Sequence, residues 1–223
     1  MPALILDGKV VREARLPELK EKIRALIESP TLAIIQVGDR EDSTSYIKAK
    51  TAFGEKLGVK VRHIKLDEKI SQREIIAKVR ECNEDETVKG IIVQLPLPVG
   101  INREAVIEAI SPKKDVDSLT PFNVKQWLEG CEVALLPATT RGVKGLLEYY
   151  KIGLFGKRVV IVGRSMLVGR PLEAFCLNEG ASVAICHSKT VDLASETRKA
   201  DVLIVAVGNP KLIGAGHVRI GVV

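Results

Sequence analysis

The chain has 223 residues, of which 46% are hydrophobic and 28% are charged, so it can bury a core as one or two soluble domains. No apolar run approaches the roughly 18 residues of a membrane span and no export signal opens the chain, so we expect a cytoplasmic protein without membrane contact. The net charge of +6 comes from Lys and Arg interspersed with Asp and Glu, which predicts a solvated surface and no nucleic-acid partner. The scattered cysteines and histidines predict neither a disulfide framework nor a metal site.

Short β-rich runs alternate with helical patterns along the first half of the chain. We expect strands at 31–38, 59–66 and 88–97, separated by helices near 43–57 and 71–84. This alternation is typical of an α/β fold with a largely parallel sheet.

The first expected helix carries a candidate pair of functional residues. Asp42 to Ser45 are candidate caps, and Gly58 marks the C-terminal end. Tyr46 and Lys50 are four residues apart, so they lie one turn from each other and can converge on one ligand. The stripe expected to face inward comprises Tyr46, Ala49, Lys50, Phe53 and Leu57. A lysine on such a stripe is rare without a functional reason, although a lysine that snorkels from the stripe's edge fits the periodicity equally well.

Two further polar features follow. Gln94 lies in the apolar run VKGIIVQLPLP, where a buried amide is either a satisfied core residue or a ligand contact at the carboxyl edge of the sheet. The segment KKDVDS then places Asp115 and Asp117 in a loop. Loop carboxylates are usually solvated caps, so these two are candidate functional residues only in combination with the other polar residues.

A second α/β series begins after residue 139. A helix over 140–150 precedes strands expected at 158–163, 182–186 and 202–208, with helices from about 168 and near 191–200 between them. We therefore predict two lobes, an N-terminal α/β catalytic domain over 1–138 and a C-terminal Rossmann-like dinucleotide-binding domain over 139–223.

The first strand of the second series runs into the glycine turn GRSMLVGRP. Gly163 allows a tight turn, Gly169 allows close packing or ligand approach, and the following helix is expected to offer free N–H groups to a pyrophosphate. The spacing differs from GxGxxG, so the turn alone fits an ordinary strand-to-helix connection equally well.

The end of the second strand favours NADP over NAD. An NAD site usually has Asp or Glu there to bind the ribose diol, whereas this strand ends in His187, Ser188 and Lys189. Arg164, Ser188 and Lys189 can donate to a 2′-phosphate instead. The alternative is that they are ordinary loop residues, and His187 is expected to position or stack against a ring rather than to catalyse.

Four motifs together carry a family resemblance. In order, and over essentially the whole chain, YIKAK, GIIVQLPLP, KKDVDS and VGRSMLVGRP with ICHSKT resemble the signature segments of the methylenetetrahydrofolate dehydrogenase/cyclohydrolase family. The resemblance implies oxidation of 5,10-methylenetetrahydrofolate to the methenyl form with NADP, then hydrolysis to 10-formyltetrahydrofolate in the same cleft. It also implies a homodimer that serves one-carbon metabolism and purine biosynthesis.

Matched residue by residue, the resemblance implies roles for the polar residues. Tyr46 would pack on the aromatic portion of the folate, Lys50 would be the cyclohydrolase catalytic residue, Gln94 its partner and Asp117 the anchor of the pterin ring. The cofactor would be held by Gly163, Arg164, Ser165, Gly169 and Ser188. The chemistry of the reaction agrees with the role implied for Lys50. The methenyl intermediate is a cation, and a neutral lysine beside it can act as the base that activates water. Hydride transfer needs mainly close positioning of the two partners.

Three departures from the family pattern stand out. Ser118 follows Asp117 where the family usually has glycine, and Pro137 to Thr140 read PATT in place of the commoner Pro-Cys-Thr-Pro. The chain stops at Val223, where the family continues the strand and adds a glycine-rich loop and a final helix. Because Ile220 to Val223 look like the opening of a buried strand, we expect that these 223 residues are not the complete functional polypeptide.

Two other functions fit part of the pattern. A two-lobed NADP dehydrogenase of the shikimate type pairs similar lobes, but it leaves the motifs around Gln94 and Asp117 unexplained. A non-catalytic folate or NADP binding protein, or an inactive partner subunit, would need no base at Lys50.

Overall fold

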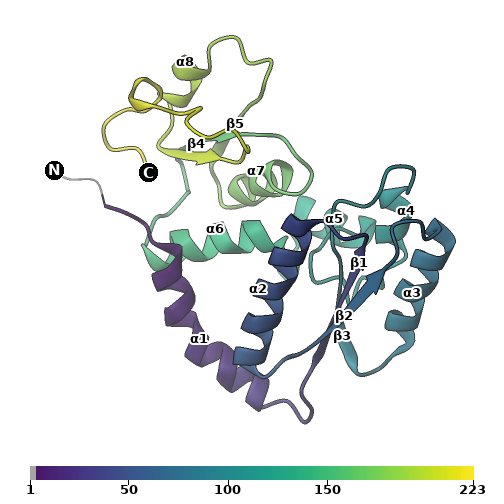
Figure 1. Cartoon of the computed structure of the whole chain (residues 1–223). Coiled ribbons are helices and arrows are strands. Elements are labelled where there is room, and N and C mark those ends of the chain that lie inside the picture. The colour runs from purple at the N-terminus through teal and green to yellow at the C-terminus, as the bar shows by residue number, and fades with distance from the viewer. Residues whose placement is uncertain (1–3) are drawn as a thin grey trace. The chain divides into compact units, whose positions relative to one another are not determined.

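The computed structural model describes residues 4–223, which form two compact units. The first unit is Asp7–Asn123, and the second is Val124–Val223 together with the short segment before Asp7. Each unit holds one three-stranded sheet, with strand orders β2-β1-β3 and β5-β4-β6 (Figure 1). All strand pairs are parallel, so the predicted α/β class with two lobes is confirmed.

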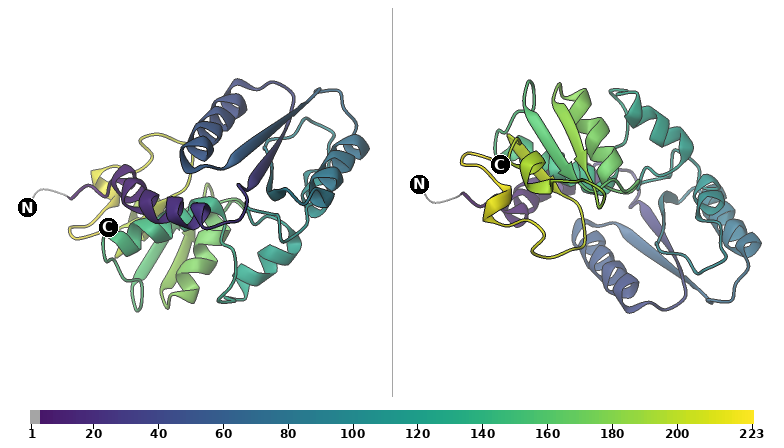
Figure 2. Two further views of the ribbon diagram at one scale, coloured as in Figure 1. Left: turned by 90° about the horizontal axis from the view of Figure 1, so that it is seen from below. Right: turned by 90° about the horizontal axis from the view of Figure 1, so that it is seen from above.

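The first unit is built around β1, its central strand. Its elements are α1 Gly8–Arg24, β1 Thr31–Val37, α2 Glu41–Leu57, β2 Lys60–Leu66, α3 Gln72–Glu84, β3 Val88–Val93 and α4 Arg103–Glu108, and α5 Pro121–Leu128 crosses into the second unit. Alternate residues of β1 face opposite sides. Ala33, Ile35 and Val37 pack with α3 and α4, whereas Ile34 packs with Ile47 of α2. Figure 2 shows α2 and α3 on opposite faces of this sheet.

The start of α2 differs from the prediction. The helix begins at Glu41 with Arg40 as its N-cap, and no side chain caps it, so the expected caps from Asp42 to Ser45 are wrong. Asp42 instead forms an ion pair with Arg40 at 2.9 Å and accepts a hydrogen bond from the backbone N–H of Ser43. The predicted end is confirmed, because Gly58 has the left-handed φ of 83° that glycine adopts readily.

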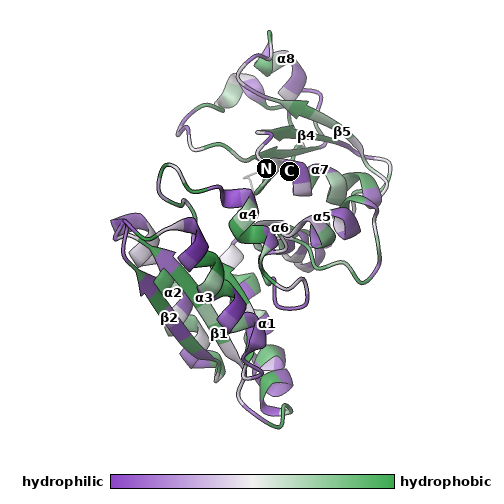
Figure 3. Cartoon of the chain, turned by 90° about the vertical axis from the view of Figure 1, so that its right-hand side faces the viewer, coloured by the Kyte–Doolittle hydropathy of each residue, from purple (hydrophilic) through white to green (hydrophobic). Residues whose placement is uncertain are grey.

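The second unit repeats the arrangement around β4. Its elements are α6 Ala138–Tyr149, β4 Arg158–Val162, α7 Gly169–Asn178, β5 Ser182–Cys186, α8 Leu193–Thr197, β6 Val202–Val205 and the 3₁₀ turn η1 Ala215–His217. Val159 and Ile161 face α6 and α7, while Val160 and Val162 face α8 and the segment 212–222. The helices of both units mix hydrophilic and hydrophobic residues (Figure 3), as helices that cover one face of a sheet do.

The last residues only partly follow the expected strand. Ile220 is fully exposed and Gly221 has φ 82°, so the expected buried strand does not begin at Ile220. Val223 lies beside β6, since its N–H donates to the carbonyl of Asp201 and its carbonyl accepts from the N–H of Leu203. Within residues 4–223, no helix has both the length and the apolar character needed to cross a membrane.

A capping box at the start of α3 gives a test of this local structure. Ser71 Oγ accepts from the N–H of Glu74 at 3.3 Å, and Glu74 Oε2 accepts from the N–H of Ser71 at 3.0 Å. Ser71→Ala removes the cap and should lower the free energy of unfolding by about 1 kcal/mol in urea denaturation. Ser45→Ala changes an exposed serine within α2 and is the control. Equal midpoints for the two variants would contradict the capping role.

Candidate active site

Lys50 and Gln94 are in direct contact at the carboxyl edge of the first sheet. Lys50 Nζ donates to Gln94 Oε1 at 3.1 Å, and Gln94 Nε2 donates to the carbonyl of Leu95 at 3.0 Å. The backbone N–H of Gln94 donates to the carbonyl of Ile35, which extends the pairing of β3 with β1 by one residue. Both ends of the amide are therefore bonded, and its oxygen is held toward the lysine.

The face of α2 that packs on the sheet lies one position away from the predicted stripe. Ser43, Ile47 and Gly54 are the buried residues of this helix, and Tyr46 is 67% exposed. Because one residue turns a helix by about 100°, centring the buried stripe on Ile47 leaves Tyr46 facing outward and Lys50 half-buried at the edge. The expected inward position of Tyr46 is thus wrong, but its phenol stays one turn from Lys50 on the accessible side.

A second buried amide, which the sequence interpretation missed, lies on the neighbouring strand. Gln36 is 1% exposed, and its Nε2 donates to Thr44 Oγ1 at 3.2 Å. Its Oε1 lies 2.9 Å from His63 Nε2, within hydrogen-bond distance. This network joins β1, β2 and the first turn of α2. The run AIIQVG could have revealed it, because it embeds an amide among apolar residues just as the run around Gln94 does.

Asp117 lies in a turn that follows a short parallel bridge to β3. Asp115 pairs with Ile91 in the parallel sense, and the N–H of Ser118 donates to the carbonyl of Asp115. The chain therefore runs along β3 toward its carboxyl end before it turns at Asp117, which is half-buried. Ser118 takes the left-handed φ of 58°, a conformation that glycine adopts without strain.

The glycine turn of the second unit is packed against itself. A Cβ at Gly163, whose φ is 122°, would lie 2.5 Å from the carbonyl oxygen of Ala206. A Cβ at Gly169 would lie 2.3 Å from the carbonyl oxygen of Gly163. Both neighbours are backbone atoms, so no side-chain rotation can make room. Close backbone approach therefore requires glycine at both positions.

Ser165 changes the expected donor set at the start of α7. Its Oγ accepts from the N–H groups of Val168 at 3.2 Å and Gly169 at 3.4 Å, and its carbonyl accepts from the N–H of Arg170 at 3.0 Å. The expectation of free N–H groups at this helix start is therefore wrong for these three donors. Ser165 therefore satisfies N–H groups that a helix start otherwise offers to an anion.

The end of β5 lies beside this turn in the same sheet. The N–H of Gly163 donates to the carbonyl of Cys186 at 2.8 Å. Beyond it, His187 Nδ1 accepts from the N–H of Lys189 at 3.1 Å, which closes a turn that leaves Ser188 and Lys189 exposed. Arg164 is exposed as well, so hydroxyl and cationic donors lie at this edge. Burial raises the pKa of the Cys186 thiol, which makes it a poor nucleophile here.

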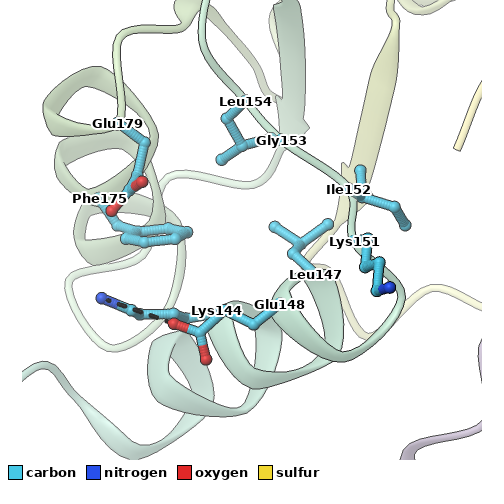
Figure 4. Close-up of a pocket in the computed structure, with 9 residues that line it drawn as sticks. All are labelled: Lys144, Leu147, Glu148, Lys151, Ile152, Gly153, Leu154, Phe175 and Glu179. Carbon is cyan, nitrogen blue, oxygen red and sulfur yellow. Dashed lines mark ion pairs between the residues drawn. The ribbon is translucent and has the colours of Figure 1, made fainter.

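A separate pocket lies at the opposite end of the second sheet (Figure 4). It has a volume of about 260 Å³ and is lined by Lys144, Leu147, Glu148, Lys151, Ile152, Gly153, Leu154, Phe175 and Glu179. Lys144 lies 5.9 Å from the centroid of the Phe175 ring and 3.9 Å from Glu148. Leu154 precedes β4 and Glu179 follows α7, so the pocket is near the amino ends of the strands and away from the glycine turn.

Two family models match most of the chain. The catalytic domain of tetrahydrofolate dehydrogenase/cyclohydrolase matches residues 6–117, and the NAD(P)-binding domain of the same enzymes matches residues 137–223. The bifunctional protein FolD of Bacillus cytotoxicus is 41% identical over 226 residues, covering 100% of this chain and 79% of that protein.

Solved structures give the same result. The bifunctional FolD of Campylobacter jejuni is 43% identical with a TM-score of 0.96, covering 99% of this chain and 79% of that one. The dehydrogenase-cyclohydrolase of Trypanosoma brucei, solved with NADP and an inhibitor, is 34% identical with a TM-score of 0.90, covering 96% and 75% of the two chains.

The glycine turn predicts an effect on cofactor binding. Gly169→Ala places a methyl group against the backbone of Gly163, so the turn must open. The dissociation constant for NADP, measured by fluorescence titration, should rise at least about tenfold, the equivalent of roughly 1.4 kcal/mol. Gly142→Ala adds a methyl group in α6, where nothing lies within 4 Å, and should bind NADP as the parent does. Tight NADP binding by Gly169→Ala would show that the turn does not hold the cofactor.

Proposed function

Because the chain belongs to the tetrahydrofolate dehydrogenase/cyclohydrolase family, we propose that it oxidises 5,10-methylenetetrahydrofolate with NADP and hydrolyses the methenyl product to 10-formyltetrahydrofolate. The observation that carries the hydrolytic half is the hydrogen bond from Lys50 to Gln94. The half that uses NADP rests on the glycine turn and on the donors around Arg164 and Ser188.

In the hydrolytic step, the substrate carbon is part of an amidinium cation that water must attack. Lys50 uses one N–H on Gln94, and the attacking water needs a lone pair on Nζ to accept its proton. As the water oxygen bonds the carbon, that proton passes to Nζ. The resulting ammonium can return a proton to N5 as the carbon–N5 bond breaks, and the remaining hydroxyl proton leaves to solvent, which yields the 10-formyl group.

In the oxidative step, bound NADP supplies the hydride acceptor. The protein's task is to hold the folate carbon close to it, which requires no acid or base. We propose that Tyr46 packs on the aromatic portion of the folate and that Asp117 anchors the pterin ring. The exposed ring of Tyr46, one turn from Lys50, supports the first assignment. The position of Asp117 in a turn at the carboxyl end of β3 supports the second.

The remaining assignments complete the proposal. Gly163, Gly169 and Ser165 would form the cofactor turn, and Arg164 with Ser188 would bind the 2′-phosphate. The folate lobe would be residues 1–138 and the NADP lobe 139–223. We further propose a cytoplasmic homodimer that serves one-carbon metabolism and purine biosynthesis, with a tetrahydrofolate derivative as substrate and no nucleic-acid partner.

Two other functions predict different assay results. A shikimate-type dehydrogenase would not act on methylenetetrahydrofolate, and a non-catalytic binding protein would bind NADP without turnover. Mixing the purified chain with methylenetetrahydrofolate and NADP and following methenyl absorbance separates the proposed function from both. Formation of the methenyl form supports the proposal, and its absence with intact NADP binding would contradict it and leave the other two functions.

Removing the amine of Lys50 should separate the two activities. Lys50→Met keeps the apolar stem but has no base, so cyclohydrolase activity should fall by about 10²- to 10⁴-fold while dehydrogenase activity changes less. Lys48→Met alters an exposed lysine of the same helix and serves as the control. Hydrolysis of methenyltetrahydrofolate at the parent rate by Lys50→Met would exclude Lys50 as the base.

Removing Arg164 should weaken NADP more than NAD. A charge-assisted hydrogen bond to the 2′-phosphate contributes about 1.5–3 kcal/mol, so Arg164→Ala should raise the NADP Michaelis constant by roughly 10- to 150-fold and that of NAD much less. Arg170→Ala removes an exposed arginine that pairs with Glu173 at 2.8 Å and is the control. Equal changes for both cofactors in Arg164→Ala would show that Arg164 does not contact the phosphate.

A further inference from the structure

The turn that carries Asp117 is held by the residues immediately before it. Asp115 is 2% exposed, and its Oδ2 accepts from the N–H of Thr120 at 2.8 Å and from Asn123 Nδ2 at 2.9 Å. These bonds tie the turn to the start of α5. The carbonyl of Lys114 accepts from the N–H of Ile91 at 2.7 Å, which ties the same segment to β3.

Lys114 fixes the other end of the segment. Its Nζ donates to the carbonyls of Asn83 at 2.7 Å and Cys82 at 3.2 Å in the last turn of α3, and to the carbonyl of the C-cap residue Asp85 at 2.8 Å. A cation at a helix C-terminus also interacts favourably with the helix dipole. Lys114 is therefore bonded to backbone carbonyls, and Asp115 to one backbone N–H and the side-chain amide of Asn123, although loop residues of these types are usually solvated.

Val116, between the two aspartates, packs against Gly90 of β3, which has no side chain. A Cβ added at Gly90 of β3 would lie 2.6 Å from Val116 Cγ1 and 3.2 Å from Leu32 Cδ1. Val116 thus fills the space that the missing side chain leaves. The packing of Val116 against Gly90 and the hydrogen bonds of Asp115 together fix the backbone that leads to Asp117.

We propose that Asp115 is a positioning residue for Asp117. This inference rests on the proposed function, in which Asp117 binds the pterin ring. Asp117 lies in a turn outside the named helices and strands, and the buried carboxylate of Asp115, two residues earlier, ties the backbone of that turn to Thr120 and Asn123. Asp115 itself acts through the backbone and touches neither substrate nor cofactor.

The geometry also predicts which substitution is tolerated. Both hydrogen bonds use Asp115 Oδ2, and Oδ1 is buried and accepts no hydrogen bond from the described residues. An asparagine can place its oxygen at the Oδ2 position and its amide nitrogen at the other. Asp115→Asn should therefore keep the turn in place, whereas Asp115→Ala removes both bonds.

The test compares Michaelis constants of the dehydrogenase reaction. Asp115→Ala should raise the constant for methylenetetrahydrofolate at least about tenfold, with kcat and the NADP constant within about threefold of the parent, and Asp115→Asn should stay near the parent in all three. Asp117→Asn should reproduce the folate effect. Asp85→Ala, which removes an aspartate side chain of the same unit that is bonded to Thr87 and Arg62, should leave the folate constant unchanged.

Each outcome bears on a different claim. A parent without dehydrogenase activity contradicts the proposed function, and a normal folate constant in Asp117→Asn contradicts the role of Asp117. If Asp117→Asn is impaired but folded Asp115→Ala is not, or if Asp115→Asn is impaired as strongly as Asp115→Ala, the positioning role is wrong. If Asp115→Ala does not fold, Gly90→Ala decides: it displaces Val116 and should raise the folate constant, and an unchanged constant overturns the inference.

Discussion

The parallel pairing of three strands, with the first strand in the centre, determines where chemistry can occur in each unit. β1 has β2 on one side and β3 on the other, and β4 has β5 and β6 in the same way. In such sheets the loops diverge at the carboxyl ends of the strands and leave a crevice there. Gln94 follows β3 at this edge, and its bond to Lys50 connects the edge to α2. The same constraint brings the glycine turn after β4 beside the end of β5.

The polar residues at these edges are fixed by other polar residues rather than by the apolar core. Gln94 is held by the carbonyl of Leu95, and Gln36 links His63 to Thr44. In the second unit, Ser165 binds the first N–H groups of α7. A buried donor or acceptor without a partner costs about 1–3 kcal/mol, so such networks admit few alternative arrangements. That rigidity suits a site whose oxidative step depends on positioning.

The sequence predicted the periodic elements well and the irregular ones poorly. Alternation of strands and helices and the glycine end of α2 follow from short-range patterns. The approach of Lys50 to Gln94, which are 44 residues apart, is implied by the family resemblance instead. The exposed position of Tyr46 does not follow from either, because a helix with few large apolar residues leaves its buried face uncertain by one position. The bonds of Ser165 to α7 and of Asp115 to α5 arise from loop conformations, which residue spacing does not encode.

The central claim is that the Lys50–Gln94 pair performs the hydrolytic step while hydride transfer needs only positioning. The most direct measurement is the time course of methenyl absorbance for the parent and for Gln94→Leu, each given methylenetetrahydrofolate and excess NADP. Gln94→Leu should form the methenyl compound at nearly the parent rate but accumulate much more of it, because hydrolysis is slowed. Identical time courses, or loss of methenyl formation with folding and NADP binding intact, would contradict the claim.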